Sequence, residues 1–283
     1  MKRLLFALSL VSSIIVGGCL ADIRPPAVKE NGLVNQAEID GRALLKKVEK
    51  LYGGREAFLL KTSVNAIASD RWPGLLPRTF FMPWYKNDQK FNLKWLITTD
   101  NARLEFIEEP HRGEVWGIQN WATYIQKAGS EKPVFRQDDD IKFWLPTLEY
   151  FIEAPFRLSQ AQIVQYAGEK IVNQKVYQLV FISWGEPGPQ KTIDQYLVYI
   201  NKATGLVDYL TYTVRDMMPF ITGIMHYSNH KIIDGILVPH LLTVVNDFND
   251  HDVLHEMTIH SLEFDKKPDK KMIIPRPELG YPK

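Results

Sequence analysis

The sequence has almost no cysteine, no excess of either charge and no apolar run long enough to span a bilayer. Cys19 is the only cysteine among 283 residues, so no internal disulfide is possible. Lysine and arginine number 34, and aspartate and glutamate number 33, which gives no indication of a nucleic-acid partner. Apolar residues make up 45% and charged residues 24%, as in ordinary globular proteins. This composition excludes a disordered chain and a membrane protein with many spans.

The N-terminus has the organisation of an export signal. Lys2 and Arg3 precede an apolar stretch of about 13 residues, shorter than the roughly 20 that span a bilayer. The sequence 16–19, Val-Gly-Gly-Cys, resembles the bacterial lipobox, in which the cysteine becomes lipidated. We therefore expect a signal peptide over 1–18 and a lipid anchor at Cys19. The alternative is a plain signal peptide with an incidental cysteine.

The residue after Cys19 indicates in which membrane the protein is anchored. It is Leu20 rather than aspartate, and by resemblance to lipoprotein sorting signals this implies an outer-membrane anchor that faces the periplasm. Acylation of Cys19 would leave no thiol for redox or nucleophilic chemistry. The next residues, 19–35, contain Pro25-Pro26 and the turn pair Asn31-Gly32, and they are typical of a flexible lipidated tether.

Helical periodicity comes first in the rest of the chain, and strand periodicity follows it. Apolar residues recur at spacings of three and four over 36–52, which predicts a helix that Gly53-Gly54 ends. A second short helix begins at Arg55. From Ser63 the apolar period changes to two residues, with turn residues between the runs. The expected strands of this half are 63–70, 78–85, 90–98, 102–108, 113–119 and 121–127.

A helical stretch interrupts the strands in mid-chain. The aspartates 138–140 suit a helix N-terminus, and Pro146 indicates two short helices or one kinked helix, which Pro155 closes. Segments between strands are too short for parallel crossovers. The pattern predicts an α+β domain, mainly β: a curved antiparallel sheet or incomplete β-barrel of about eleven strands with a helical lid. The strands expected after the helix are 162–167, 175–184, 192–201, 205–215, 220–228, 232–238, 240–246 and 253–264.

The layout of helix, meander, mid-chain helix and second meander carries a family resemblance. With the hairpin phrase 199–207 and the turn 234–239, it resembles the lipoprotein-localisation-factor-like (LolA/LolB-like) domains of bacterial lipoproteins, in an uncharacterised subfamily. The resemblance covers about 36–265 and implies an incomplete β-barrel with helices over its mouth. The segment 266–283 is then a charged, Pro-rich tail, expected to be poorly packed.

Histidines and glutamates are the candidates for a metal site. His251 and His255 have the i, i+4 spacing of helical metal ligands, but a strand separates such residues by about 13 Å. We therefore expect histidines at hairpin edges and no metal. Convergence of other histidines across strands stays open. Glu149 and Glu153 favour a solvated helix face over half a carboxylate metal site. The histidines of this region are His226, His230, His240, His251, His255 and His260.

The sequence contains none of the common enzyme motifs. A Gly-x-Ser-x-Gly elbow, a P-loop and a dinucleotide fingerprint are all missing. The prediction is therefore a chain that is not an enzyme, with no catalytic residue and no cofactor.

The high aromatic content, 12% of the chain, gives the remaining functional indication. Aromatic residues gather on the mid-chain helix and on nearby strands, where they either line an apolar cavity or fill the core. An acyl chain needs only apolar walls, at about 0.8 kcal/mol per buried CH₂. The residues expected to line a ligand cavity are Trp116, Trp121, Phe143, Trp144, Tyr150 and Phe151.

These observations predict a protein that a lipid anchor holds at the outer membrane and that binds or shuttles a lipid or other hydrophobic ligand. Two alternatives stay open. One is an interaction protein with a filled barrel that docks another envelope protein. The other is a metal-dependent enzyme that uses the C-terminal histidines.

Overall fold

Thirteen antiparallel strands form one continuous sheet in the computed structural model, which describes residues 20–248, 252–265 and 273–276. The strand order is β6-β5-β4-β3-β2-β1-β13-β12-β11-β10-β9-β8-β7. The first and last of these strands along the chain, β1 and β13, are therefore neighbours near the middle of the sheet. The strands are β1 (Ser63–Arg71), β2 (Asp88–Leu96), β3 (Asn101–Phe106), β4 (Val115–Gln119), β5 (Ala122–Gln126), β6 (Val134–Phe135), β7 (Ile163–Val172), β8 (Lys175–Ser183), β9 (Gln195–Asn201), β10 (Val207–Thr213), β11 (Thr222–Ile233), β12 (Ile236–Val245) and β13 (Val253–Asp265).

Two meanders build this sheet, and the pairing of β1 with β13 joins them. Ser63 lies opposite Asp265, and the register continues to Arg71 opposite Glu256, with one irregularity after Ile67. Strands β1 to β6 extend from this junction to one edge, and β13 to β7 extend to the other. The chain must therefore travel from one edge of the sheet to the opposite edge between β6 and β7.

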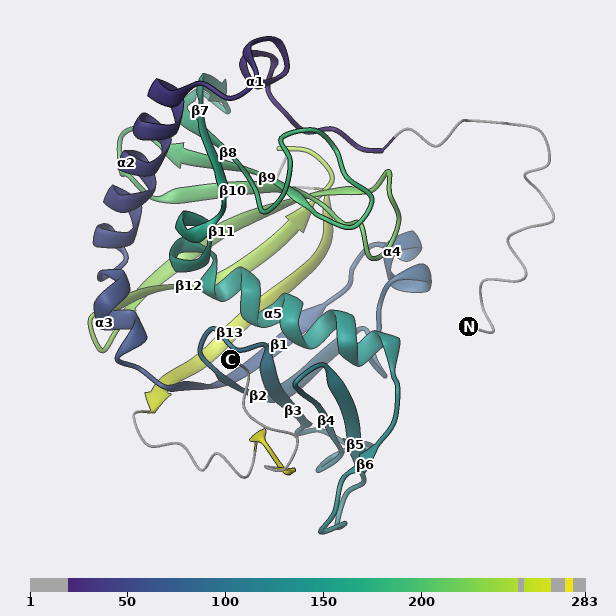
Figure 1. The fold of residues 1–283 in the computed structure, drawn as a ribbon. Coiled ribbons are helices and arrows are strands. Elements are labelled where there is room, and N and C mark those ends of the chain that lie inside the picture. Colours follow the sequence, from purple (N-terminus) through teal and green to yellow (C-terminus); the bar gives the residue numbers. More distant parts are fainter. Residues whose placement is uncertain (1–19, 249–251, 266–272, 277–283) are drawn as a thin grey trace, which may run out of the picture.

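Helix α5 (Asp139–Arg157) makes that crossing over the concave face of the sheet (Figure 1). Its 19 residues span roughly 28 Å at 1.5 Å per residue. The Asp138 side chain caps the helix by accepting a hydrogen bond from the Ile141 N–H at 3.2 Å. Of the two alternatives, two short helices is wrong, because Pro146 and Pro155 both lie inside one helix, which ends at Arg157 rather than at Pro155. Packing of the apolar face against the sheet offsets the missing N–H groups.

Helix α2 (Asn35–Leu51) packs beside β7 and is the helix predicted from periodicity. Its close approach depends on Gly41, because a Cβ there would lie 2.9 Å from the backbone nitrogen of Tyr166. The buried face contains Leu45 and Val48, whereas Ile39 is 61% exposed. The shorter helices are α1 (Pro26–Asn31), α3 (Arg55–Leu59), α4 (Leu75–Phe80) and the 3-10 turn Leu158–Gln160.

The segment expected to be a flexible tether is packed instead, over the residues that the structure describes. Val28 of α1 is 3% exposed and joins an apolar cluster with β7 to β10 on the outer face of the sheet. The Ala21 N–H donates to the Pro219 carbonyl at 2.9 Å, and the Val34 N–H donates to Gln165 Oε1 at 2.9 Å. The prediction of a flexible tether is therefore wrong for residues 20–35. Cys19 and the signal segment lie outside the described residues.

The tail expected to be poorly packed has one ordered stretch, 273–276. Ile273 and Ile274 are buried against Leu96, and Arg276 exchanges two hydrogen bonds with Gln119. The remainder of 266–283 lies outside the described residues.

The fold class is confirmed, and the sheet has 13 strands rather than about eleven. The predicted strand 78–85 is wrong, because α4 and a turn occupy it. The strands predicted at 220–228, 232–238 and 240–246 are two long strands, β11 and β12, joined at Asp234-Gly235. The short strand β6 was missed. Among the described residues, no helix has the length and apolar character to cross a membrane.

Candidate ligand-binding site

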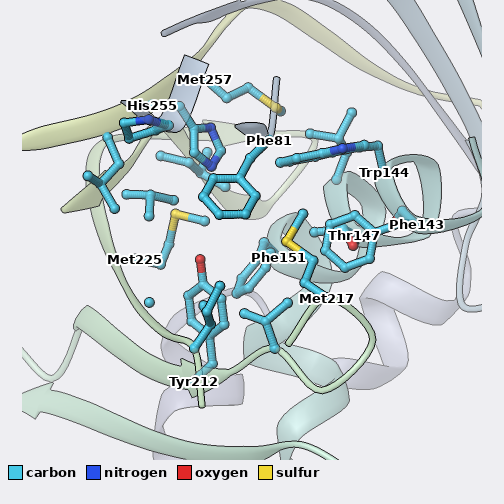
Figure 2. A pocket seen from close by; sticks show the side chains of 18 of the residues that line it. Phe81, Phe143, Trp144, Thr147, Phe151, Tyr212, Met217, Met225, His255 and Met257 are labelled. Atoms are coloured by element: carbon cyan, nitrogen blue, oxygen red, sulfur yellow. Dashed lines mark hydrogen bonds between the residues drawn. The ribbon is translucent and has the colours of Figure 1, made fainter. Parts of the chain in front are cut away.

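An apolar cavity of about 140 Å³ lies between α5 and the concave face of the sheet (Figure 2). Residues of α5 form one wall, and strands β10 to β13 with the loop after β10 form the other. Trp72, Pro77 and Phe81, from the segment that contains α4, complete the lining. A cavity of about 150 Å³ with apolar walls holds benzene in a well-studied case, so this one takes a comparable group without rearrangement. Its walls include Phe81, Phe143, Trp144, Leu148, Phe151, Met217, Met225, Leu242, Val244 and Met257.

Two further cavities share walls with the first. One, of about 310 Å³, shares Phe143, Phe151 and Tyr212 with it. The other, of about 650 Å³, shares Phe81, Phe143, Trp144 and Met217. The Phe143 side chain lines all three. The second and third cavities are each within the size range of sites that hold drug-sized ligands, roughly 300–1,000 Å³.

A buried carboxylate holds in place a histidine side chain that lines the first cavity. Asp70 is fully buried and accepts hydrogen bonds from the Trp72 and Trp84 Nε1–H groups at 2.8 and 2.6 Å. The same carboxylate lies 3.1 Å from His255 Nδ1. The imidazole also stacks on Trp72, with ring centres 4.4 Å apart and planes within 8°. Asp70 and Trp72 therefore hold His255 in one orientation on the cavity wall.

Tyr212 of β10 places a hydroxyl in the same cavity. It lies opposite Gly223 of β11, and a Cβ at Gly223 would come within 2.5 Å of the Tyr212 ring. Glycine is therefore required for the ring to lie across β11. Figure 2 shows the hydroxyl directed into the cavity, toward the wall that carries His255. Burial raises the pKa of Tyr212, so its hydroxyl stays protonated.

Below the C-terminal half of α5, Arg157 binds three carboxylates. Its guanidinium lies 2.7 Å from Glu153, 2.5 Å from Glu149 and 2.8 Å from Asp100. Glu153 also accepts from the Trp95 Nε1–H at 2.9 Å. Burial, the Glu153 charge and the Asp100 charge raise the pKa of Glu149 well above its ordinary value, against the opposing effect of Arg157. This cluster anchors α5 to the loop after β2.

The predicted solvated face of α5 was therefore wrong. Glu149 is 0% exposed and Glu153 is 1% exposed, and both face Arg157 rather than water. The spacing of i, i+4 between Glu153 and Arg157 was visible in the sequence, but the inward direction of that face was not.

The structure places five of the six aromatic residues named in the sequence analysis on cavity walls, and their contact with a ligand stays a prediction. Phe143, Trp144 and Phe151 line the first cavity, and Tyr150 lines the second. Trp121 is 56% exposed and lines the second and third. Trp116 is different, because it packs in the core against other aromatic rings, with Phe106 and Trp84 at 5.0 and 5.8 Å.

The histidines expected at hairpin edges have separate surroundings. His226 stacks on Tyr209, His240 bonds the Val238 carbonyl, and His260 bonds Ser69. No group of three metal-binding side chains occurs among the residues that the structure describes. His251 of the predicted His251/His255 pair lies outside them.

His255 and Tyr212 were missed as site residues. His255 was assigned to a hairpin edge, although it lines the cavity. A weak signal was available, since Asp70 and Trp72 lie two residues apart and a buried aspartate requires donors. Nothing in the sequence linked these residues to His255, because 185 positions separate it from Asp70.

No protein-family model and no curated protein matches the sequence. A DUF1329 family protein from Desulfovibrio piger matches the structure with a TM-score of 0.51 and 10% identity, over 84% of this chain and 97% of that one. This likeness shows the fold, in agreement with the layout expected from the sequence.

Two other solved structures align with lower scores. A LolA superfamily protein from Nitrosomonas europaea has a TM-score of 0.47 and 11% identity, over 82% of this chain and 96% of its own. A putative outer membrane lipoprotein-sorting protein domain from Vibrio parahaemolyticus has a TM-score of 0.49 and 9% identity, over 83% and 96%.

Proposed function

We propose that this chain is an envelope protein, lipid-anchored at Cys19, that binds a lipid or another hydrophobic ligand between α5 and the sheet. The observation that carries the proposal is the apolar cavity below α5, which side chains leave unfilled at about 140 Å³. Unfilled apolar space costs stability, so its presence favours binding over a purely structural role. The export signal and Leu20 after the cysteine support an outer-membrane location facing the periplasm.

The shared walls explain how a ligand longer than the first cavity fits. Phe143 and Met217 lie between the first cavity and the third, and both are only partly buried. Rotation of these two side chains opens one continuous channel, without any movement of the sheet. The chain of an acyl ligand then runs from the concave face to the surface, where Phe80 and Trp121 are exposed.

Native mass spectrometry of the full chain carrying Cys19→Ala, made in a bacterial periplasm, tests this proposal. We expect a lipid-sized adduct that disappears on denaturation. Met217→Trp, which places an indole in the wall between two cavities, should reduce the adduct. Ile171→Trp is the matched control, because Ile171 is 71% exposed on β7 and lines none of these cavities. A protein that stays bare after incubation with envelope lipids would contradict ligand binding.

A second candidate function is docking of another envelope protein. The exposed apolar side chains of α4 favour it, since Leu75, Leu76 and Phe80 are 66%, 68% and 64% exposed. In this case Leu76→Ser should release a partner from the chain and leave any bound lipid in place. Co-purification after chemical crosslinking in intact cells measures the first effect.

A further inference from the structure

We infer that the cavity recognises the undissociated carboxylic acid group of a long-chain ligand, with Tyr212 and His255 as its two polar contacts. This inference rests on the proposed function, and it names the ligand class and its orientation. The acid group lies inside, between β10 and β13, and the hydrocarbon chain leads outward past Phe143.

The two polar groups both stand on the wall that the sheet forms, at separate places in a largely apolar cavity. Tyr212 is on β10 and His255 is on β13, with β11 and β12 between them. Three strand spacings and an offset of two residues along the strands separate their backbones by roughly 16 Å, and the curvature of the sheet turns both side chains toward the space beneath α5. Figure 2 shows the Tyr212 hydroxyl directed toward the His255 wall. Thr147, also on the wall, already donates to the Phe143 carbonyl at 2.6 Å.

Both groups have unused hydrogen-bonding capacity. The Tyr212 hydroxyl makes no hydrogen bond to any residue that the structure describes, and burial raises its pKa, so it is a protonated donor. His255 uses only Nδ1, which lies 3.1 Å from the Asp70 carboxylate. In the neutral imidazole the hydrogen is then on Nδ1, and Nε2 carries a lone pair that accepts a hydrogen bond. This unused capacity makes both groups available as contacts for a ligand.

One donor and one acceptor together match a carboxylic acid. Its carbonyl oxygen accepts from the Tyr212 hydroxyl, and its O–H donates to His255 Nε2. Transfer of that proton to Nε2 would give a carboxylate beside an imidazolium, with the same number of protons and the same two hydrogen bonds. An ester keeps the carbonyl acceptor and lacks the donor. A hydrocarbon lacks both and leaves the two protein groups unpaired.

The architecture keeps these two groups in place. Gly223 gives the Tyr212 ring its position, because any Cβ there would overlap the ring. Asp70, with three donors around it, fixes the His255 ring from the other side.

The outer cavity favours the inward orientation of the acid group. Phe80 and Trp121, which are 64% and 56% exposed, line it and suit a hydrocarbon chain. Asp139, Asp140 and Asp216 line it with only Lys142 in opposition. A carboxylate left at this mouth would face three like charges, whereas the emerging hydrocarbon chain has no charge to repel.

Binding of dodecanoic acid and of its methyl ester to the full chain carrying Cys19→Ala, measured by calorimetry, tests the inference. We expect the acid to bind roughly tenfold more tightly, which is the effect of one lost hydrogen bond. Tyr212→Phe should weaken both ligands by a similar factor, because both use the carbonyl contact. His255→Phe should weaken the acid alone. Tyr199→Phe, the same change on the outer face of the sheet, should alter neither affinity.

The outcomes separate the inference from the proposed function. Equal affinities for acid and ester, or no effect of Tyr212→Phe, would overturn the inference and leave hydrophobic binding intact. Failure of both ligands and of envelope lipids to bind would refute the proposed function itself. Tyr212→Phe removes a hydroxyl without a described hydrogen bond, so we expect an unchanged melting temperature. If His255→Phe unfolds because Asp70 loses a donor, the Tyr212→Phe comparison still decides the question.

Discussion

Replacement of Arg157 by methionine is the most informative perturbation of the fold. Arg157 carries the positive charge that faces Glu149, Glu153 and Asp100, at 2.5 to 2.8 Å. Methionine retains the aliphatic volume and removes the charge, which leaves two fully buried carboxyl groups without their counter-ion. Breaking a buried ion pair in this way costs about 3–5 kcal/mol, and we expect that loss in the free energy of unfolding at pH 8.

The loss should depend on pH, with a sign that the structure determines. Burial raises the pKa of Glu149 and of Glu153, and Arg157 opposes both shifts. Without Arg157 the shifts grow, so the folded variant binds more protons than its unfolded state between the ordinary carboxyl pKa, 4.5, and the raised one. Stability then falls as pH rises through this window. The deficit relative to the unchanged protein is therefore largest at pH 8 and shrinks toward pH 5, by up to about 1.4 kcal/mol per pH unit for each group that takes up a proton.

Urea unfolding at pH 5, 6.5 and 8, followed by tryptophan fluorescence, measures the effect. The matched control is Glu149→Gln, which imitates a protonated Glu149 and keeps Arg157 paired with Glu153 and Asp100. We expect it to change the free energy of unfolding by less than about 1 kcal/mol, because three carboxylates face one guanidinium in the native cluster. A deficit for Arg157→Met that stays constant from pH 5 to pH 8, or one below 1 kcal/mol, would refute this reasoning.

Two further predictions concern the membrane anchor and the packing of α2. Cys19→Ala should move the protein from the membrane fraction to the soluble fraction after cell lysis, and retention in the membrane would show that the lipobox interpretation is wrong. Gly41→Ala should lower the free energy of unfolding by about 1–3 kcal/mol in urea titrations, because its Cβ would lie 2.9 Å from the Tyr166 nitrogen. An alanine at Lys47, which is exposed on the same helix, is the control, and equal effects would contradict the close-approach argument.

Periodicity alone predicted most of the elements. The three-and-four spacing over 36–52 corresponds to α2, and alternation of apolar residues correctly located β1, β2, β8 and β9. These are local properties, since a helix or strand face shows in neighbouring residues whatever the rest of the chain does. The error at 78–85 has the same origin. Short aromatic runs alternate well enough to suggest a strand, but residues 75–80 form a helical turn beside β13.

The composition and order of these elements also predicted the class of fold, because closely spaced strands can pair only in antiparallel fashion. The strand order was a different matter. The pairing of Ser63 with Asp265 joins residues about 200 positions apart, and no local pattern records it. That one junction makes β6 and β7 the two edges of the sheet, and so it determines that α5 crosses the whole concave face.

The same division holds for the candidate site. The sequence by itself determined that aromatic residues gather on the mid-chain helix, and five of the six expected residues line cavities. Only the tertiary structure decided which polar side chains join them. His255 was assigned to a hairpin edge and the glutamates of α5 to solvent. The physical reason is that a polar residue is buried only where partners from distant strands meet it, as Asp70 meets His255 and Arg157 meets Glu149.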